Sequence, residues 1–282
     1  MVMKIAKYWE KAEGNALNRE GVMHRATCWG GSADSPEAAH QRARAKLRHW
    51  ARLVQEQPDP FDTYGYDTGE IREELVEEIT GSGGTVIGAI TRNGYGALVL
   101  NTPRLLIADV DAHPAGLVDR LKARFASGST PKTRRLAEIQ AFHAHHPELG
   151  LTVFETHAGL RVFLTNQAHH PDAHTARQLM IALGTDPLYQ RLCQSQHCYR
   201  ARLSPKPWRC GTTRPPNRYP RELGEASQTY THWLAAYSHH SAGYAVCRPM
   251  LTLGPTAQDE DTARLMTLHQ AMTVRPGELP LA

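Results

Sequence analysis

The stretch TVIGAITRNGYGALVLNTPRLLIADVDAH, residues 85 to 113, contains three apolar runs in close succession. The first two runs flank RNGYG, a glycine-containing segment typical of a tight turn between antiparallel strands. Pro103 then leads from the second run into LLIADVD. The stretch therefore predicts a hairpin followed by a further strand.

Two aspartates interrupt the last of these runs, at positions 109 and 111. Alternate side chains of a strand point to the same side, so Asp109 and Asp111 should project side by side while Val110 faces the core. Two adjacent carboxylates repel, and a divalent cation held together with substrate phosphates relieves that repulsion. The pair predicts a site for Mg²⁺ or Mn²⁺; the alternative is a strand that reaches the surface, with Asp111 capping the next helix.

The rest of the chain alternates between strand and helix patterns. It predicts a strand at 24–31, helices at 35–57, 70–81, 113–126, 130–146 and 172–184, and a hairpin at 150–166. Ser35, Thr130 and Asp172 are the expected N-caps, and Gly184 is the expected helix end. This order favours an α+β fold, with helices packed on a mostly antiparallel sheet.

Three regions are expected along the chain. Residues 1–80 form an N-terminal strand and helix region, 81–209 form the core, and 210–282 form a linker and a C-terminal helical appendage. The linker is assigned to 210–223 because that segment is rich in proline and arginine.

Composition narrows the class of protein. The chain has 282 residues, with 32 basic and 28 acidic side chains, a balance that permits a polyanionic partner without requiring one. The odd number of cysteines, five, and an N-terminus without an apolar signal core indicate a reduced, cytoplasmic protein, and no apolar run is long enough for a membrane helix. The motifs of P-loop NTPases, dinucleotide enzymes and α/β-hydrolases are absent from the sequence.

A group of cationic side chains follows a third aspartate within residues 182–209. Asp186 comes directly after a predicted helix, Arg200 and Arg202 share one side of a predicted strand, and Lys206 follows. The planar fork of arginine matches phosphate oxygens, so this group predicts a clamp for a triphosphate or a nucleic-acid backbone. The alternative is an edge strand that carries solvated cations.

These segments together resemble a known family. IADVD, THAGLR and GTDPLYQRLC followed by YRAR are similar to the three motifs of the archaeo-eukaryotic primase superfamily, the primase-polymerases, over about residues 85 to 209. The resemblance implies a primase-polymerase-like core in which Asp109, Asp111 and Asp186 hold the metal ions, while His157 and Arg161 in THAGLR contact the phosphates of the nucleotide. The whole chain also resembles a group of bacterial proteins that carry TRNxYGxLVLNT and RARLxPKPWR.

The chain departs from the family at one position. Members normally have histidine where this sequence has Arg161, and arginine stays protonated and cannot accept a proton. The resemblance implies template-dependent nucleotidyl transfer, with a nucleoside triphosphate and DNA or RNA as partners. Arg161 favours the alternative of a catalytically inactive nucleotide- or nucleic-acid-binding module, and a metal-dependent phosphoesterase is the third alternative.

Aromatic and cysteine side chains are further candidates for ligand binding. Asn93 and Tyr95 lie in the turn just before the strand that carries the acids, and Tyr95 could stack on a base. Trp208 stands between cations in SPKPWR and offers a second stacking site. Zinc is not expected, because closed zinc sites use tighter pairs than the spacing of Cys193, Cys198 and Cys210.

Overall fold

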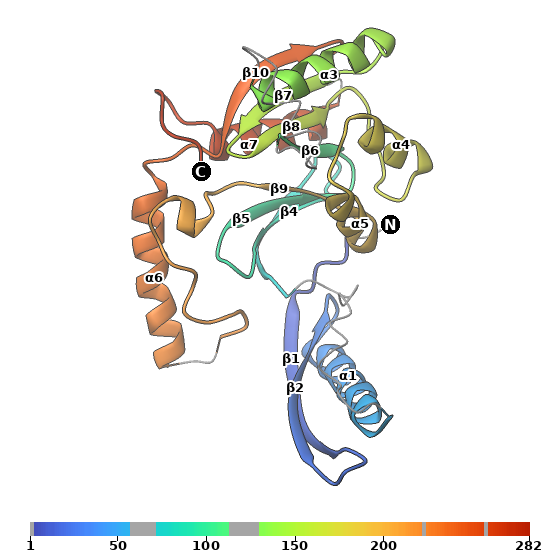
Figure 1. Cartoon of the computed structure of the whole chain (residues 1–282), viewed down its shortest axis with the longest axis vertical. Coiled ribbons are helices and arrows are strands. Elements are labelled where there is room, and N and C mark those ends of the chain that lie inside the picture. The colour runs from blue at the N-terminus through green and yellow to red at the C-terminus, as the bar shows by residue number, and fades with distance from the viewer. Residues whose placement is uncertain (1–2, 57–71, 113–129, 222–223, 257–258) are drawn as a thin grey trace. The chain divides into compact units, whose positions relative to one another are not determined.

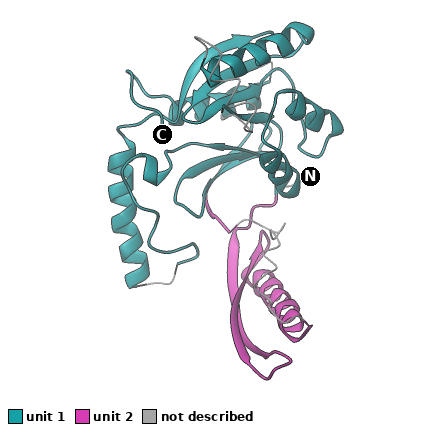
Figure 2. Cartoon of the chain, viewed as in Figure 1, with its two compact units in different colours: residues 1–3, 76–282 teal, residues 4–75 magenta. Residues whose placement is uncertain are grey.

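The chain forms two compact units, which Figure 2 shows in different colours. The computed structural model describes residues 3–56, 72–112, 130–221, 224–256 and 259–282. One unit spans Lys4–Leu75, and the other consists of Met1–Met3 and Val76–Ala282. The chain thus divides at residues 75 and 76, and the residues on both sides of position 210 belong to the same unit.

The smaller unit is a two-stranded antiparallel ribbon with one helix packed against both strands. Its elements are β1 (Tyr8–Leu17), β2 (Met23–Ser32) and α1 (Pro36–Glu56). The Oγ of Ser35 accepts a hydrogen bond from the Ala38 N–H at 3.1 Å, which confirms the expected cap. A Cβ at Gly30 of β2 would lie 2.2 Å from the Ala39 carbonyl oxygen of α1, so only glycine permits this close packing.

The larger unit contains two four-stranded sheets, with the strand orders β10-β7-β8-β6 and β3-β4-β5-β9 (Figure 1). The strands of the first sheet are β6 (Ile107–Asp111), β7 (Leu151–Thr156), β8 (Gly159–Leu164) and β10 (Cys247–Leu253). Those of the second are β3 (Glu74–Thr80), β4 (Val86–Arg92), β5 (Leu98–Thr102) and β9 (Tyr199–Arg202). Within the first sheet all pairs are antiparallel, as are β4–β5 and β5–β9 in the second. The expected α+β class is confirmed, with two antiparallel sheets in place of one.

Helices and a shared core hold the larger unit together. The helices are α3 (Pro131–His145), α4 (His174–Ala182), α5 (Pro187–Gln196), a short 3-10 helix (Pro207–Arg209), α6 (Glu225–Ser241) and α7 (Glu260–Thr273). One hydrophobic cluster takes side chains from both sheets and from four of these helices, including Leu100 of β5, Phe163 of β8 and Leu265 of α7. A smaller cluster joins Cys210 to three aromatic residues of α6.

Two local expectations from the sequence are wrong. The acidic segment 70–81 is not a helix where it is described: it forms strand β3, in which Ile79 is buried while Glu77 and Glu78 are exposed. Its β-branched residues suit a half-buried strand. Pairing of β3 with β4 in the sheet overrides the helix preference of its glutamates. Asp172 does not cap α4, whose N-cap is Ala173; its carboxylate instead lies 2.5 Å from Nδ1 of His197. The helix expected at 113–126 lies outside the described residues.

The C-terminal segment is part of the larger unit and is not an appendage. Strand β10 pairs with β7 along the edge of the first sheet, and Leu265 of α7 is fully buried in the main core. Met266 of α7 and Val246, which directly precedes β10, also belong to the core cluster that the middle of the chain begins. The fold that positions the candidate site therefore needs residues from 76 to 282.

Candidate functional site

The two aspartates of β6 lie opposite the hairpin strand β8. Asp109 is the register partner of Arg161, and Asp111 is the partner of Gly159. Val110 between them is buried, as expected, while Asp109 is partly exposed and Asp111 is exposed. The pleat thus places both carboxylates on one face of β6.

Arg161 is buried, with 2% of its surface exposed, and its side chain bonds to residues of other segments. Its Nε lies 3.2 Å from Oδ1 of Asp109, and its Nη1 donates to the carbonyl oxygen of Arg202 at 3.0 Å and to Nε2 of His269 at 3.4 Å. Burial alone would lower the pKa of Arg161, but the nearby charge of Asp109 raises it overall. The guanidinium therefore stays charged and ties β6, β8, β9 and α7 together.

His269 is the neutral partner of this arginine. Burial and the charge of Arg161 hold the pKa of His269 well below its ordinary value. Because arginine only donates, Nε2 must accept and Nδ1 carries the proton. That Nδ1 is buried and has no hydrogen-bond partner among the described residues.

Asp186 reaches the same region through its backbone. Its N–H donates to the carbonyl oxygen of Asp109 at 3.2 Å, and its Oδ1 accepts from the Tyr189 N–H at 2.8 Å, as the N-cap of α5. The hydroxyl of Tyr189 in turn donates to the carbonyl oxygen of Arg200 at 3.0 Å. The third aspartate thus fixes α5 between β6 and β9.

A pocket of about 210 Å³ collects most of the residues expected to bind phosphate. It is lined by Asn93, Tyr95, Val99, Asp109, Arg161, Tyr189, Arg200, Arg202 and Lys206. Arg200 and Arg202 alternate with buried residues on β9, so both side chains leave the strand on the pocket side, as the strand period predicts. The described lining residues bring together four cations and one carboxylate, that of Asp109.

Arg202 has the least favourable surroundings of the four cations. Its Nε and Nη1 atoms are buried and have no hydrogen-bond partner within the described part of the chain. Burial, followed by the charge of Arg161, lowers the pKa of Arg202, and burial together with the charges of Arg202 and Arg209 lowers that of Lys206. Unpaired buried cations are costly, so this arrangement is one that an anionic ligand would relieve.

Aromatic rings stand beside the pocket. Tyr95, which lines it, meets Trp208 edge to face with ring centroids 5.3 Å apart. Trp208 is 46% exposed, and the cationic groups of Lys206 and Arg214 lie 5.7 Å and 5.1 Å from its ring centroid. Asn93 has a structural task, because its Oδ1 accepts the N–H groups of Tyr95 and Ala97 and holds the turn.

Several expected site residues lie outside the pocket lining. His157 is exposed, and its Nδ1 bonds to the carbonyl oxygen of Leu281. Asp111 and Asp186 do not line the pocket, and within the described residues no group of three or more metal-ligating side chains gathers. The three cysteines considered for zinc are buried; burial raises the pKa of Cys193 to about 12, and Cys210 belongs to the α6 cluster.

Sequence reasoning missed Tyr189 and His269. Tyr189 stands three residues after Asp186, a spacing that a helix cap would have indicated. Nothing in the sequence indicates that His269, more than a hundred residues from Arg161, is its partner.

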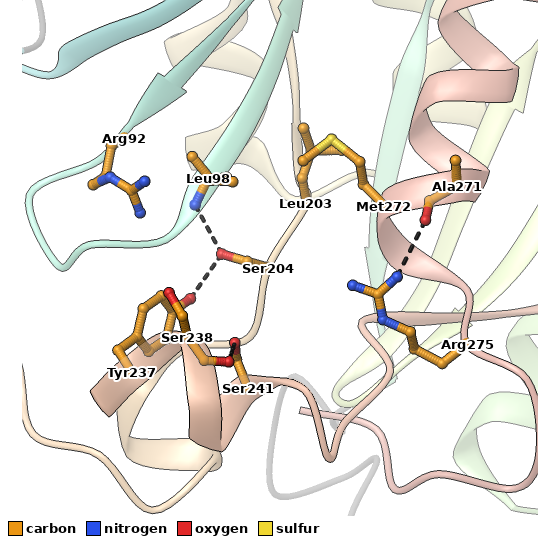
Figure 3. A pocket seen from close by; sticks show the side chains of 10 residues that line it. All are labelled: Arg92, Leu98, Leu203, Ser204, Tyr237, Ser238, Ser241, Ala271, Met272 and Arg275. Atoms are coloured by element: carbon orange, nitrogen blue, oxygen red, sulfur yellow. Dashed lines mark hydrogen bonds between the residues drawn. The ribbon is translucent and has the colours of Figure 1, made fainter. Parts of the chain in front are cut away.

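A second pocket of about 250 Å³ lies beside α6 and α7 (Figure 3). It is lined by Leu98 and Leu203, the chain neighbours of Val99 and Arg202, so it lies on the other face of the β5–β9 pair. Ser204 within it accepts the Leu98 N–H at 2.9 Å and lies 2.7 Å from the Tyr237 hydroxyl. These polar groups connect α6 to the second sheet.

Acidification should destabilise the protein through His269. Its pKa in the folded state lies below the value of about 6.5 of an unfolded chain, so the unfolded state binds more protons below that pH. The free energy of unfolding should then fall as the pH drops below about 6.5, by at most about 1.4 kcal/mol per pH unit from this group. Urea unfolding at pH 7.5 and 5.5 measures the effect; His269→Gln, which keeps an acceptor for Arg161, should lose less stability than the wild type. Identical losses in both proteins would contradict the assignment.

Comparison with known proteins adds no identification. No protein-family model, curated protein or solved structure matches the chain. Among the helices that the structure describes, none has the length and apolar character needed to cross a bilayer. The chemistry of the pocket therefore carries the functional assignment.

Proposed function

We propose that the protein binds a nucleoside triphosphate, with its phosphates in the pocket between β6, β8 and β9. The observation that carries the proposal is Arg202, whose buried nitrogens have no hydrogen-bond partner among the residues that the structure describes, in a pocket whose described lining holds four cations and one carboxylate. Arginine forks match phosphate oxygens, and charge-assisted hydrogen bonds of this kind are about twice as strong as neutral ones. A polyphosphate would satisfy these donors and offset the repulsion among them.

The aromatic pair beside the pocket supports a nucleotide in preference to a simple phosphate. Tyr95 lines the pocket and contacts the exposed Trp208, so a base extending from the phosphates would meet aromatic surface. Stacking on such rings is tolerant of base identity. The proposal therefore includes binding without strong base preference.

The acidic residues do not fit a preformed metal site. Asp109 is hydrogen-bonded to Arg161, and Asp186 caps α5, so two of the three carboxylates implied by the primase-polymerase resemblance serve protein partners. No step of the proposed binding is assigned to a metal. The catalytically inactive module expected as an alternative from Arg161 is thus the form of the proposal that the geometry supports best.

Calorimetric titration with ATP, tripolyphosphate and adenosine tests the proposal. We expect ATP and tripolyphosphate to bind in the presence of EDTA, with affinity that weakens as salt rises, and adenosine alone to bind far more weakly. Absence of ATP binding, or binding that EDTA abolishes, would contradict it.

A second candidate is template-dependent nucleotidyl transfer by a cytoplasmic primase-polymerase-like protein with Mg²⁺ or Mn²⁺. It is favoured by one observation, the projection of Asp109 and Asp111 from the same face of β6 next to the cationic pocket. Incorporation of labelled nucleotides on DNA and RNA templates with either metal tests this candidate, and product analysis separates transfer from phosphoester hydrolysis.

A further inference from the structure

We infer that the smaller unit binds duplex nucleic acid through Arg44, Arg48 and Arg52 of α1, here called the arginine stripe. All three side chains are exposed and follow one another at intervals of four residues. None of them has a hydrogen bond or an ion pair among the residues that the structure describes. This inference is independent of the nucleotide pocket, which belongs to the other unit.

The structure of the helix explains why the stripe faces solvent. Ala39, Ala43 and Val54 are fully buried, which assigns the opposite side of α1 to packing. Arg42 shows what a structural arginine of this helix does: its Nη1 donates to the carbonyl oxygen of Gly31 at 2.6 Å. The stripe arginines have no such task.

Spacing and charge match a phosphate backbone. Residues four apart on a helix are separated by about 6 Å along its axis, so the stripe extends over about 12 Å. The only acids in α1, Glu37 and Glu56, lie at its two ends, which leaves the intervening surface positive. A duplex carries one negative charge per about 1.7 Å, and its major groove admits a helix.

Two other polyanions fit less well. A helix that lies in a membrane surface inserts a wide apolar face, but in α1 the residues Ala39, Ala43 and Val54 are buried within the protein and the opposite side carries the arginine stripe. Single-stranded nucleic acid is bound by exposed aromatic platforms, and the one aromatic residue of α1, Trp50, is only partly exposed. Duplex backbone contact needs only the cations that the stripe supplies.

Salt-dependent binding of a labelled 20-base-pair duplex to the full chain tests the inference, by fluorescence anisotropy between 50 and 200 mM NaCl. The triple variant Arg44→Gln, Arg48→Gln, Arg52→Gln should bind more weakly, and its slope of log affinity against log salt should be shallower by about 2.7, or about 0.9 for each lost phosphate contact. Exposed substitutions of this kind change stability little, which a thermal melt checks. The same binding measurement, made with a DNA duplex and with an RNA duplex, shows which backbone is preferred.

The matched control removes the same charge elsewhere. Arg177, Arg191 and Arg264 are exposed arginines on helices α4, α5 and α7, and their triple glutamine variant should keep wild-type binding. Arg202→Gln should also bind the duplex normally, which separates this surface from the nucleotide pocket. The inference is overturned if the wild type does not bind the duplex, if both triple variants lose affinity equally, or if the stripe variant loses binding to phosphatidylserine vesicles and not to the duplex.

Discussion

Replacing Arg202 by glutamine should weaken ATP binding about 10- to 100-fold, because charge-assisted hydrogen bonds contribute about 1.5 to 3 kcal/mol. The same substitution should leave the ligand-free protein at least as stable as the wild type. Nε and Nη1 of Arg202 are buried and have no partner in the described ranges, and burial together with the charge of Arg161 lowers the pKa of Arg202. Removing the cation therefore relieves a cost of the folded state. Calorimetry and urea unfolding measure the two effects.

The matched control for this prediction is Arg177→Gln, an exposed arginine of α4 that does not line the pocket. It should change neither ATP affinity nor stability by a measurable amount. If Arg202→Gln instead destabilised the protein and left ATP binding unchanged, Arg202 would be a structural residue.

Replacing Arg161 by methionine should lower the free energy of unfolding by about 2 to 4 kcal/mol. The buried guanidinium donates to the carbonyl oxygen of Arg202 and to Nε2 of His269, and methionine leaves both acceptors without a donor. Loss of the Asp109 pair adds little, because that carboxylate is 44% exposed and water can solvate it.

Urea unfolding of the methionine variant checks this prediction, with Arg191→Gln on the surface of α5 as the control. A change below about 0.5 kcal/mol, the range of ordinary surface substitutions, would show that Arg161 does not brace the site. Two arginines of one pocket are thus expected to affect stability in opposite directions.

The sequence predicted the elements whose signals are local. The turn at RNGYG, the caps Ser35 and Thr130 and the alternation of Arg200 and Arg202 depend on neighbouring residues, and the structure confirms each of them. Strand β3 was missed because its glutamates favour a helix, whereas its conformation depends on pairing with β4.

The candidate site was predicted only in part, because local patterns indicate which way a side chain points but not which distant residues it contacts. Because side chains of a strand alternate between its two faces, the sequence placed both aspartates on one face of β6 and both arginines on one side of β9. A cationic pocket near the acids could therefore be expected. The burial of Arg161 and its contact with His269 depend on how α7 packs against the first sheet, which no local pattern encodes. Asp186 was expected to hold a metal ion together with Asp109, whereas its contact with Asp109 through the backbone and its use as the cap of α5 followed only from the structure.

A crystal structure of the protein with ATP, grown in the presence of EDTA, tests the central claim most directly. The account predicts phosphate oxygens within about 2.7 to 3.2 Å of the Nε or Nη1 atoms of Arg202, with Lys206 or Arg200 on the same phosphate chain. A triphosphate bound elsewhere, with the buried nitrogens of Arg202 still unpartnered, would contradict it.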